Sequence, residues 1–220
     1  YLTSNMLVRD TLKIRQHILS LVNQSPHKQN TINFHLRALH TFFAYCIEME
    51  YCDKNPITAA MIPDKIINEP RPFTKSEIAE IIAQLRSGAN YRKFTKEREE
   101  MVLLIRLLSV AGLRIAEALR LSKADILPDG LRIDGKRVSI NKPKIRFIPF
   151  RFLPELAEIC DALKTYNTGD RVFSWVNRTN PSEKLRNAMI SLGMDATNKN
   201  LHSLRKTALN WWEKELGLPE

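Results

Sequence analysis

Glycine, paired cysteine and long apolar runs are all scarce in this 220-residue sequence, and each scarcity excludes a class of protein. The seven glycines form no GxGxxG or GxxxxGK[ST] motif, which argues against a nucleotide-dependent enzyme with a glycine-rich phosphate loop. The three cysteines form no CxxC pair and the five histidines show no ligand spacing, so we expect no metal site. No apolar run approaches the roughly 18 residues that a membrane span needs, so we expect no membrane partner.

The charge balance points to a polyanionic partner. Lysine and arginine number 34 against 24 aspartate and glutamate, a formal net charge of +10, and nucleic acid is the usual partner of such a surface. A basic protein with solvated lysines remains the alternative on charge alone. The odd, sparse set of cysteines suits a reducing compartment, so we expect a cytoplasmic protein.

The beginning of the chain is predicted to be helical. Apolar residues recur at helical spacing over residues 31–51, and more weakly over residues 6–22, so each stretch has one face that packs inward. Asn30 or Thr31 is the expected N-cap of the longer helix. We predict from this pattern a small helical domain over residues 1–62.

Four prolines separate this domain from the rest of the chain. Proline cannot continue a helix and biases the residue before it toward extended backbone, so we predict a linker over residues 63–73. Thr74 then begins a helix, with Glu77 completing a capping box. The prolines are Pro56, Pro63, Pro70 and Pro72.

The remainder, residues 74–220, is predicted to be mostly helical with one small sheet. Apolar residues alternate with polar ones around a turn signal at Asp134–Gly135, which favours antiparallel strands. The fold class is therefore mainly α with a small antiparallel β-sheet (α+β). Helices are expected over 74–87, 97–110, 114–121, 154–163, 182–192 and 203–216, and a three-stranded sheet over 131–133, 138–140 and 145–150.

The predicted hairpin is strongly basic. Residues 131–151 carry seven basic residues and one acidic residue, so the segment repels itself unless an anion lies against it. A solvated strand edge protected by lysine is the alternative interpretation. The basic residues are Arg132, Lys136, Arg137, Lys142, Lys144, Arg146 and Arg151.

Two pairs of residues at helical spacing are candidates for phosphate binding. Arg114 and Glu117 follow a helix break at Gly112, and either they form an ion pair that fixes the turn or Glu117 holds Arg114 rigid for a phosphate. Arg114 is framed by apolar residues, so we expect its side chain not to reach water easily. His202 and Arg205 lie one helical turn apart and can reach one ligand, although a surface histidine beside a solvated arginine has the same spacing.

Five sequence blocks together resemble the tyrosine recombinases, the phage-integrase family. AGLRIAEALRLSKADI resembles the first arginine box of that family, and LHSLRKTA resembles the second, the His-x-x-Arg box. NKPKIRFIPF resembles the hairpin that carries the family's catalytic lysine. TINFHLRALHTFFAYCIEMEYCDKNPI resembles the end of a helical core-binding domain, and RPFTKSEIAEII resembles the start of the catalytic domain. The blocks occur in the family's order and cover nearly the whole chain.

The resemblance implies a site-specific DNA recombinase. It implies a DNA-binding core-binding domain over residues 1–62 and an integrase-like catalytic domain over residues 74–220. The implied reaction cleaves and rejoins DNA through a 3′-phosphotyrosine, without a cofactor or metal. Double-stranded DNA is the implied partner, and family members act as homotetramers on paired sites.

The same resemblance implies roles for individual residues. Arg114 and Arg205 would stabilise the five-coordinate phosphorus, and His202 would assist proton transfer. Glu117 would orient Arg114. The family's lysine usually lies eight residues before the hairpin's proline; Asn141 stands there, so Lys142 is the first candidate for the general acid and Lys144 the second. The hairpin residues expected to contact DNA are Arg137, Lys144 and Arg146.

The end of the sequence departs from the family pattern. The family's nucleophilic tyrosine lies some twenty to forty residues after the second arginine, and no tyrosine follows Arg205 here. We therefore expect the catalytic domain to be incomplete at Glu220, and Trp211 and Trp212 to be packing aromatics. A catalytically silent DNA-binding relative is the main alternative, and a type IB topoisomerase is a third interpretation.

Overall fold

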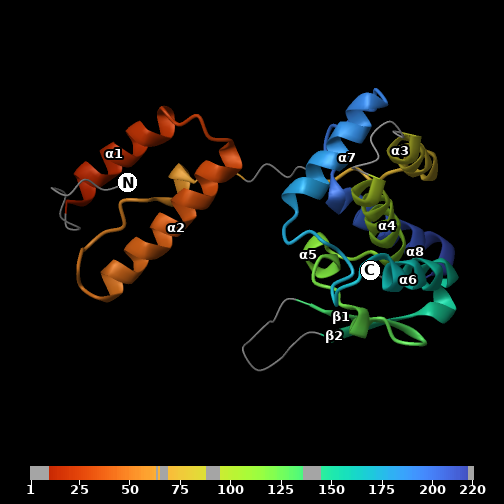
Figure 1. The fold of residues 1–220 in the computed structure, drawn as a ribbon. Coiled ribbons are helices and arrows are strands. Elements are labelled where there is room, and N and C mark those ends of the chain that lie inside the picture. Colours follow the sequence, from red (N-terminus) through yellow and green to blue (C-terminus); the bar gives the residue numbers. More distant parts are fainter. Residues whose placement is uncertain (1–9, 63, 65–68, 88–94, 136–144, 218–220) are drawn as a thin grey trace. The chain divides into compact units, whose positions relative to one another are not determined.

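The chain divides into two compact units. The computed structural model describes residues 10–62, 64, 69–87, 95–135 and 145–217 (Figure 1). The first unit is Tyr1–Asn68 and the second is Glu69–Glu220. The boundary falls within the predicted linker, and each unit has its own apolar core.

The first unit consists of two helices and a short 3₁₀ turn. Helix α1 spans Thr11–Asn23, α2 spans Gln29–Glu48, and η1 spans Ala59–Met61. Both predicted helices are present. The predicted N-cap at Asn30 or Thr31 is wrong, because α2 begins two residues earlier and both lie in its first turn. The buried residues that join the helices are Ile14, Ile18, Leu36, Phe43, Cys46, Cys52 and Ile57.

The second unit is mainly helical, as predicted. Thr74 and Glu77 form the expected capping box: the Thr74 N–H donates to Glu77 Oε2 (2.9 Å) and the Glu77 N–H donates to Thr74 Oγ1 (3.1 Å). Its helices are α3 (Lys75–Ser87), α4 (Thr95–Ala111), α5 (Ile115–Ala118), α6 (Pro154–Tyr166), α7 (Thr179–Ser191) and α8 (Leu201–Leu216), with 3₁₀ turns η3 (Lys123–Asp125) and η4 (Phe150–Phe152).

Three helices of this unit start earlier than predicted. Helix α4 begins at Thr95, two residues before the expected start. Helix α7 begins three residues before the expected start, because Pro181 lies in its first turn, where a missing N–H breaks no helical hydrogen bond. Helix α8 begins at Leu201, two residues before the expected start, because Asn200 is the N-cap.

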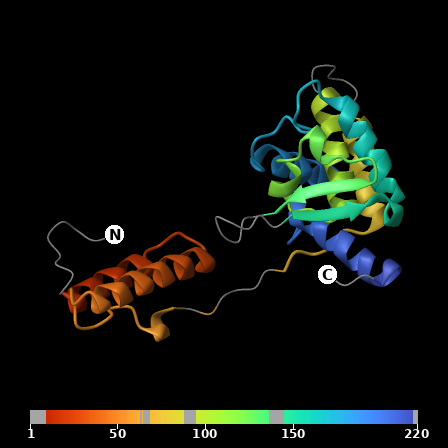
Figure 2. The ribbon, with the colours of Figure 1, turned by 90° about the horizontal axis from the view of Figure 1, so that it is seen from below.

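The sheet has two described strands. Strand β1 (Gly130–Asp134) pairs antiparallel with β2 (Ile145–Pro149), so that Leu131 lies opposite Ile148 and Ile133 lies opposite Arg146 (Figure 2). The first and last of the three expected strands therefore pair with each other, and the expected middle strand, 138–140, lies outside the described residues.

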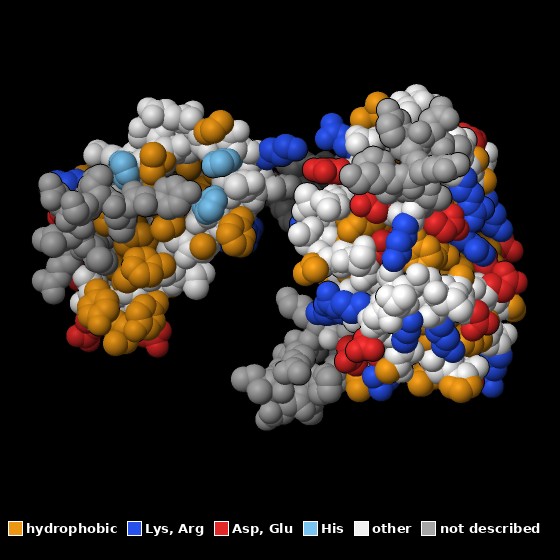
Figure 3. All heavy atoms as spheres, viewed as in Figure 1, with side chains coloured by type: hydrophobic (Ala, Val, Ile, Leu, Met, Phe, Trp, Pro, Cys, Tyr) orange, Lys and Arg blue, Asp and Glu red, His pale blue; other side chains and the backbone are white. Residues whose placement is uncertain are grey.

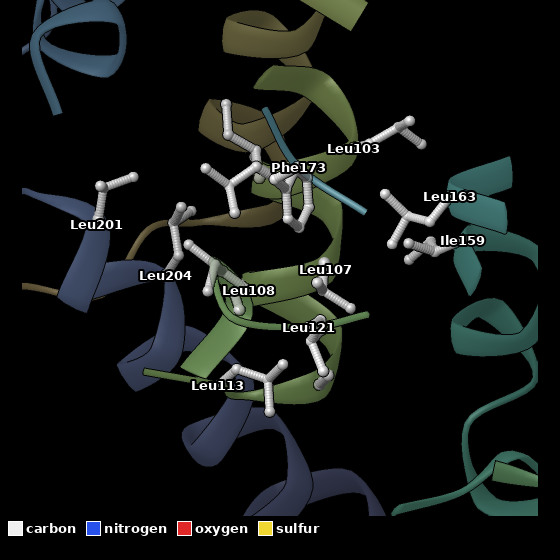
Figure 4. Packing of buried hydrophobic residues seen from close by; sticks show 14 of the residues in the cluster. Leu103, Leu107, Leu108, Leu113, Leu121, Ile159, Leu163, Phe173, Leu201 and Leu204 are labelled. Atoms are coloured by element: carbon white, nitrogen blue, oxygen red, sulfur yellow. The ribbon is translucent and has the colours of Figure 1, made fainter. Parts of the chain in front are cut away.

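Helix α4 forms the centre of the second unit's core. Its residues from Met101 to Leu108 are almost all buried, and α3, α6 and α8 pack around it (Figure 4). Burying one such leucine or isoleucine contributes about 1.5–3 kcal/mol. The core residues labelled in Figure 4 are Leu103, Leu107, Leu108, Leu113, Leu121, Ile159, Leu163, Phe173, Leu201 and Leu204.

The second half of the predicted linker is attached to α8. Glu69 pairs with Lys206 (2.8 Å), and the Phe73 N–H donates to Thr207 Oγ1 (2.8 Å). Residues 69–73 therefore belong to the second unit. None of the helices in the described part of the chain combines the length and apolarity needed to cross a membrane.

Candidate functional site

The site begins where α4 ends. Gly112 has φ +59°, a left-handed conformation that glycine adopts without strain, and its N–H donates to the Leu108 carbonyl (3.2 Å). A Cβ at Gly112 would lie 3.3 Å from the ring of Trp212 and 3.4 Å from the Cβ of Ala208. The glycine thus lets the chain turn sharply while packed against α8.

Arg114 follows this turn and caps α5. Its N–H donates to Glu117 Oε2 (2.9 Å), and its Nη1 donates to Glu117 Oε1 (3.2 Å). The Glu117 side chain is 3% exposed, whereas that of Arg114 is 60% exposed. The expectation that the Arg114 side chain does not reach water easily is wrong. Arg114 stands at the N-terminal end of α5 with its guanidinium at the surface, and Glu117 binds it from the buried side.

Glu117 holds a second arginine as well. Arg146 on β2 donates through Nη2 to Glu117 Oε2 (2.7 Å). Burial alone would raise the pKa of Glu117, but the hydrogen bonds from Arg114 and the positive charges of Arg146 and Arg114 outweigh it, so the pKa lies below its usual value. The carboxylate is therefore ionised at neutral pH.

The N-terminal end of α8 presents His202 and Arg205. Asn200 caps this helix: the His202 N–H donates to Asn200 Oδ1 (2.8 Å), and the Asn200 N–H donates to Ser203 Oγ (3.1 Å). One turn later, Arg205 Nη1 donates to the Gly112 carbonyl. That contact brings the second arginine box to the turn that carries Arg114.

His202 lies close enough to these cations for its protonation to respond to them. Partial burial of the ring lowers its pKa, and the charges of Arg205, Arg114 and Lys206 lower it further. The imidazole is therefore neutral at pH 7 and can accept a proton. Arg114, His202 and Arg205 form a cationic cluster of the kind that binds a phosphodiester, with Glu117 behind it.

Comparison with known proteins gives the fold. By sequence, the chain matches no protein-family model and no curated protein. By structure, it matches lambda integrase, bound as a dimer to a COC' core site, with a TM-score of 0.75 and 16% identity over 97% of this chain and 78% of the integrase chain. The Tn1549 transposon integrase in complex with circular intermediate DNA gives 0.68 and 13%, over 93% of this chain and 73% of that chain. The chain has the tyrosine-recombinase fold.

Two further structures share the tyrosine-recombinase fold. A lambda integrase tetramer bound to a Holliday junction matches with a TM-score of 0.72 and 16% identity, over 94% of this chain and 58% of that chain. XerH site-specific recombinase, bound to its palindromic difH substrate, matches with 0.59 and 17%, over 94% of this chain and 62% of that chain. The predicted architecture, a helical region followed by an integrase-like region, is confirmed at the level of fold.

The rest of the expected tyrosine-recombinase site is described only in part. Lys142, Lys144 and Arg137 lie outside the described residues, so their roles stay predictions. Arg146 is described, and it contacts Glu117. Among the residues that the structure describes, no group of histidine, cysteine and carboxylate side chains could hold a metal ion.

The sequence predicted the pairing of Glu117 with Arg114 but not the contact with Arg146. The first pair is local, three residues apart, whereas Arg146 is 29 residues from Glu117. No local sequence pattern relates residues this far apart, so the sequence offered no signal for Arg146 as the second partner.

The aromatic residues considered at the sequence level have structural contacts. Trp212 Nε1 donates to the Val110 carbonyl (3.0 Å), which confirms that this tryptophan is a packing aromatic. The Tyr166 hydroxyl donates to the Lys96 carbonyl, and burial raises the pKa of Tyr166 to about 12. Lys96 lies at the opposite end of α4 from Gly112. A 17-residue helix is about 25 Å long, so Tyr166 is remote from the cationic cluster.

Proposed function

We propose that this chain belongs to a DNA-cleaving and rejoining enzyme, a site-specific recombinase that acts through a 3′-phosphotyrosine. The observation that carries the proposal is the convergence of Arg114, His202 and Arg205 on one surface, with a buried carboxylate behind Arg114. Two guanidinium groups held in this way present N–H donors to the non-bridging oxygens of one phosphate. The tyrosine-recombinase fold of the chain supports the same reaction.

In the proposed reaction, a tyrosine oxygen bonds to the phosphorus of a DNA phosphodiester while the bond from phosphorus to the 5′-oxygen breaks. Arg114 and Arg205 stabilise the negative charge that builds up on the five-coordinate phosphorus. Neutral His202 accepts the tyrosine proton, and Lys142, or Lys144 in its place, donates a proton to the leaving 5′-oxygen. The ester retains the bond energy, so rejoining requires no cofactor.

The expected partner is double-stranded DNA. Most of the positive charge lies in the region with the arginine boxes, because residues 63–220 carry a net charge of +8 and residues 1–62 carry +2. In the view of Figure 3, lysine and arginine side chains are spread over the second unit, and few lie on the first. We propose that the first unit is a core-binding domain, that the protein acts as a homotetramer on paired sites, and that it works in the cytoplasm, where its three unpaired cysteines stay reduced.

The experiment that tests this function supplies an external nucleophile. Selection from a random duplex pool gives a bound DNA site, and hydrogen peroxide then replaces the tyrosine hydroxyl in attacking the phosphodiester. Arg114→Ala and Arg205→Ala are expected to slow strand cleavage by roughly 100- to 1000-fold, the usual effect of losing one fixed donor to a developing oxyanion. DNA affinity should change little, because many phosphate contacts contribute to it.

Arg132→Ala is the control, since Arg132 pairs with Asp125 rather than with Glu117. It removes the same charge and should cleave at the wild-type rate. Wild-type cleavage by Arg114→Ala and Arg205→Ala would overturn the assignment of the site.

A catalytically silent DNA-binding relative is the second candidate. The observation that favours it is the position of Tyr166, whose hydroxyl is bound to the Lys96 carbonyl, remote from the cluster. The same experiment separates the two functions. Salt-sensitive DNA binding without peroxide-dependent cleavage would support the silent relative, and the absence of DNA binding would contradict both.

A further inference from the structure

We propose that Arg146 is a positioning residue that couples the basic hairpin to Arg114 through the buried carboxylate of Glu117. This inference rests on the proposed function, and it differs from the expected role of Arg146 as a direct DNA contact. In this proposal, Glu117 fixes the position of Arg114 relative to β2, the strand that follows Lys142 and Lys144 in the sequence.

The geometry of Glu117 carries the proposal. One oxygen, Oε2, accepts both the Arg114 N–H (2.9 Å) and Arg146 Nη2 (2.7 Å), while Oε1 accepts Arg114 Nη1 (3.2 Å). The Glu117 side chain is 3% exposed and that of Arg146 is 33% exposed. A buried carboxylate with three donors has little freedom to move, so it is a fixed anchor for both arginines.

Because Arg146 lies on β2, its contact with Glu117 also fixes the position of this strand. Arg146 lies opposite Ile133 in the sheet and follows Ile145, the first residue of β2. Lys144 and Lys142 precede it by two and four residues in the sequence. Holding Arg146 therefore fixes the start of β2, which follows both candidate lysines in the sequence.

The charges explain why Arg114 depends on this contact. A guanidinium has five N–H donors, and Arg114 gives one of them to Glu117. If Arg146 were removed, the buried carboxylate would lose one cation and attract Arg114 more strongly. The N–H donors of Arg114 that are free to bind a DNA phosphate would then turn toward Glu117. The other charged residues around the hollow beside Glu117 are Arg120, Asp125, Asp134 and Arg171.

The chain offers a matched control on the adjacent strand. Arg132 on β1 pairs with Asp125 through two nitrogens (2.7 and 3.1 Å), and its side chain is 45% exposed. Arg132→Ala and Arg146→Ala each remove one positive charge from the same sheet, but only the second removes a contact to Glu117. If only the lost positive charge matters, both variants reduce DNA cleavage equally. If Arg146 acts by positioning, Arg146→Ala reduces cleavage far more than Arg132→Ala does.

The experiment compares Arg146→Ala, Arg146→Lys and Arg132→Ala by two measurements. Carbon-13 NMR should show the pKa of the Glu117 carboxyl raised in Arg146→Ala, closer to normal in Arg146→Lys and unchanged in Arg132→Ala. Peroxide-dependent cleavage at saturating DNA should fall roughly 10- to 100-fold in Arg146→Ala, as expected for a misplaced reacting group, with partial rescue in Arg146→Lys. DNA affinity should change little, because many phosphate contacts contribute to it.

Two results would overturn the proposal. One is equal weakening of DNA binding by both alanine variants with unchanged cleavage, which would make Arg146 a phosphate contact. The other is an unchanged Glu117 pKa in Arg146→Ala. If the wild-type chain cleaves no DNA, the proposed recombinase function fails, and the NMR titration still decides by itself whether Arg146 holds Glu117.

Discussion

His202 lies among cationic side chains, so its proton affinity depends on them. The imidazole is exposed, yet its pKa is lowered, first by partial burial and then by the charges of Arg205, Arg114 and Lys206. A base that stays neutral at pH 7 is suited to take a proton from a hydroxyl. Of the three cations, only Lys206 lies outside the cationic cluster, and it pairs with Glu69. Its replacement should therefore disturb the cluster least.

Lys206→Ala should raise the pKa of His202. Removing the lysine deletes one positive charge near the imidazole and leaves the Glu69 carboxylate unpaired, and both changes favour the protonated ring. Because cleavage needs the neutral ring, its rate should fall as the pH drops through this pKa. In Lys206→Ala the fall should begin at a higher pH. Titration of the His202 ring by NMR and the pH dependence of cleavage check this.

Lys184→Ala is the matched control for that measurement. Lys184 also pairs with a glutamate, Glu97 (2.8 Å), at the first turn of α4. Its removal should leave the titration of His202 unchanged. A His202 pKa that falls or stays constant in Lys206→Ala would show that the lysine charge does not act on the ring.

Local patterns predicted the residues of the site better than they predicted its long-range contacts. The pairs Arg114–Glu117 and His202–Arg205 follow from helical spacing, which a sequence displays directly. The contact from Arg205 to the Gly112 carbonyl spans 93 residues, and it depends on how α8 packs against α4. No local pattern encodes that packing.

At the level of secondary-structure elements, the junction between α4 and α8 positions the site. Gly112 ends α4 in a left-handed conformation, and its carbonyl accepts the hydrogen bond from Arg205. Trp212 packs over the same glycine and donates to the Val110 carbonyl. The helix junction is therefore both a core contact and a support for the two arginine boxes.

Gly112→Ala should destabilise the second unit more than Gly193→Ala does. Both glycines have positive φ, so alanine at either position costs about 1–2 kcal/mol of backbone strain. At Gly193 no atom lies within 4 Å of the added Cβ, whereas at Gly112 the Cβ would press on Trp212 at 3.3 Å. The extra overpacking should add about 1 kcal/mol or more. Urea denaturation followed by tryptophan fluorescence measures the difference, and equal midpoints would contradict it.

Helices were predicted well from the sequence because their spacing repeats over many residues, as in α2 and α4. Helix starts were predicted less well. Helix α7 begins at Thr179, before Pro181, and α2 is preceded by Lys28, which makes no side-chain cap hydrogen bond. Strand pairing was the weakest point, because alternation identifies strands without stating which of them are neighbours.

At the scale of the whole molecule, the chain has two cores of unequal size. The first unit buries a small set of residues between two helices, whereas the second buries a much larger set around α4. Stability grows with the apolar surface removed from water, so the first unit should unfold at a lower denaturant concentration. All three tryptophans, Trp175, Trp211 and Trp212, belong to the second unit, so tryptophan fluorescence reports on that unit alone.

Urea unfolding of the chain should therefore show two transitions by far-ultraviolet circular dichroism and one, the later, by tryptophan fluorescence. Phe43→Ala removes a fully buried side chain from the first unit, at a cost of about 3–5 kcal/mol, and should abolish the early transition without moving the fluorescence midpoint. Phe173→Ala should do the reverse, lowering the fluorescence midpoint and sparing the early transition, because Phe173 is buried in the second core. Coincident transitions in the wild type, or a fluorescence midpoint that shifts in Phe43→Ala, would show that the two units unfold as one.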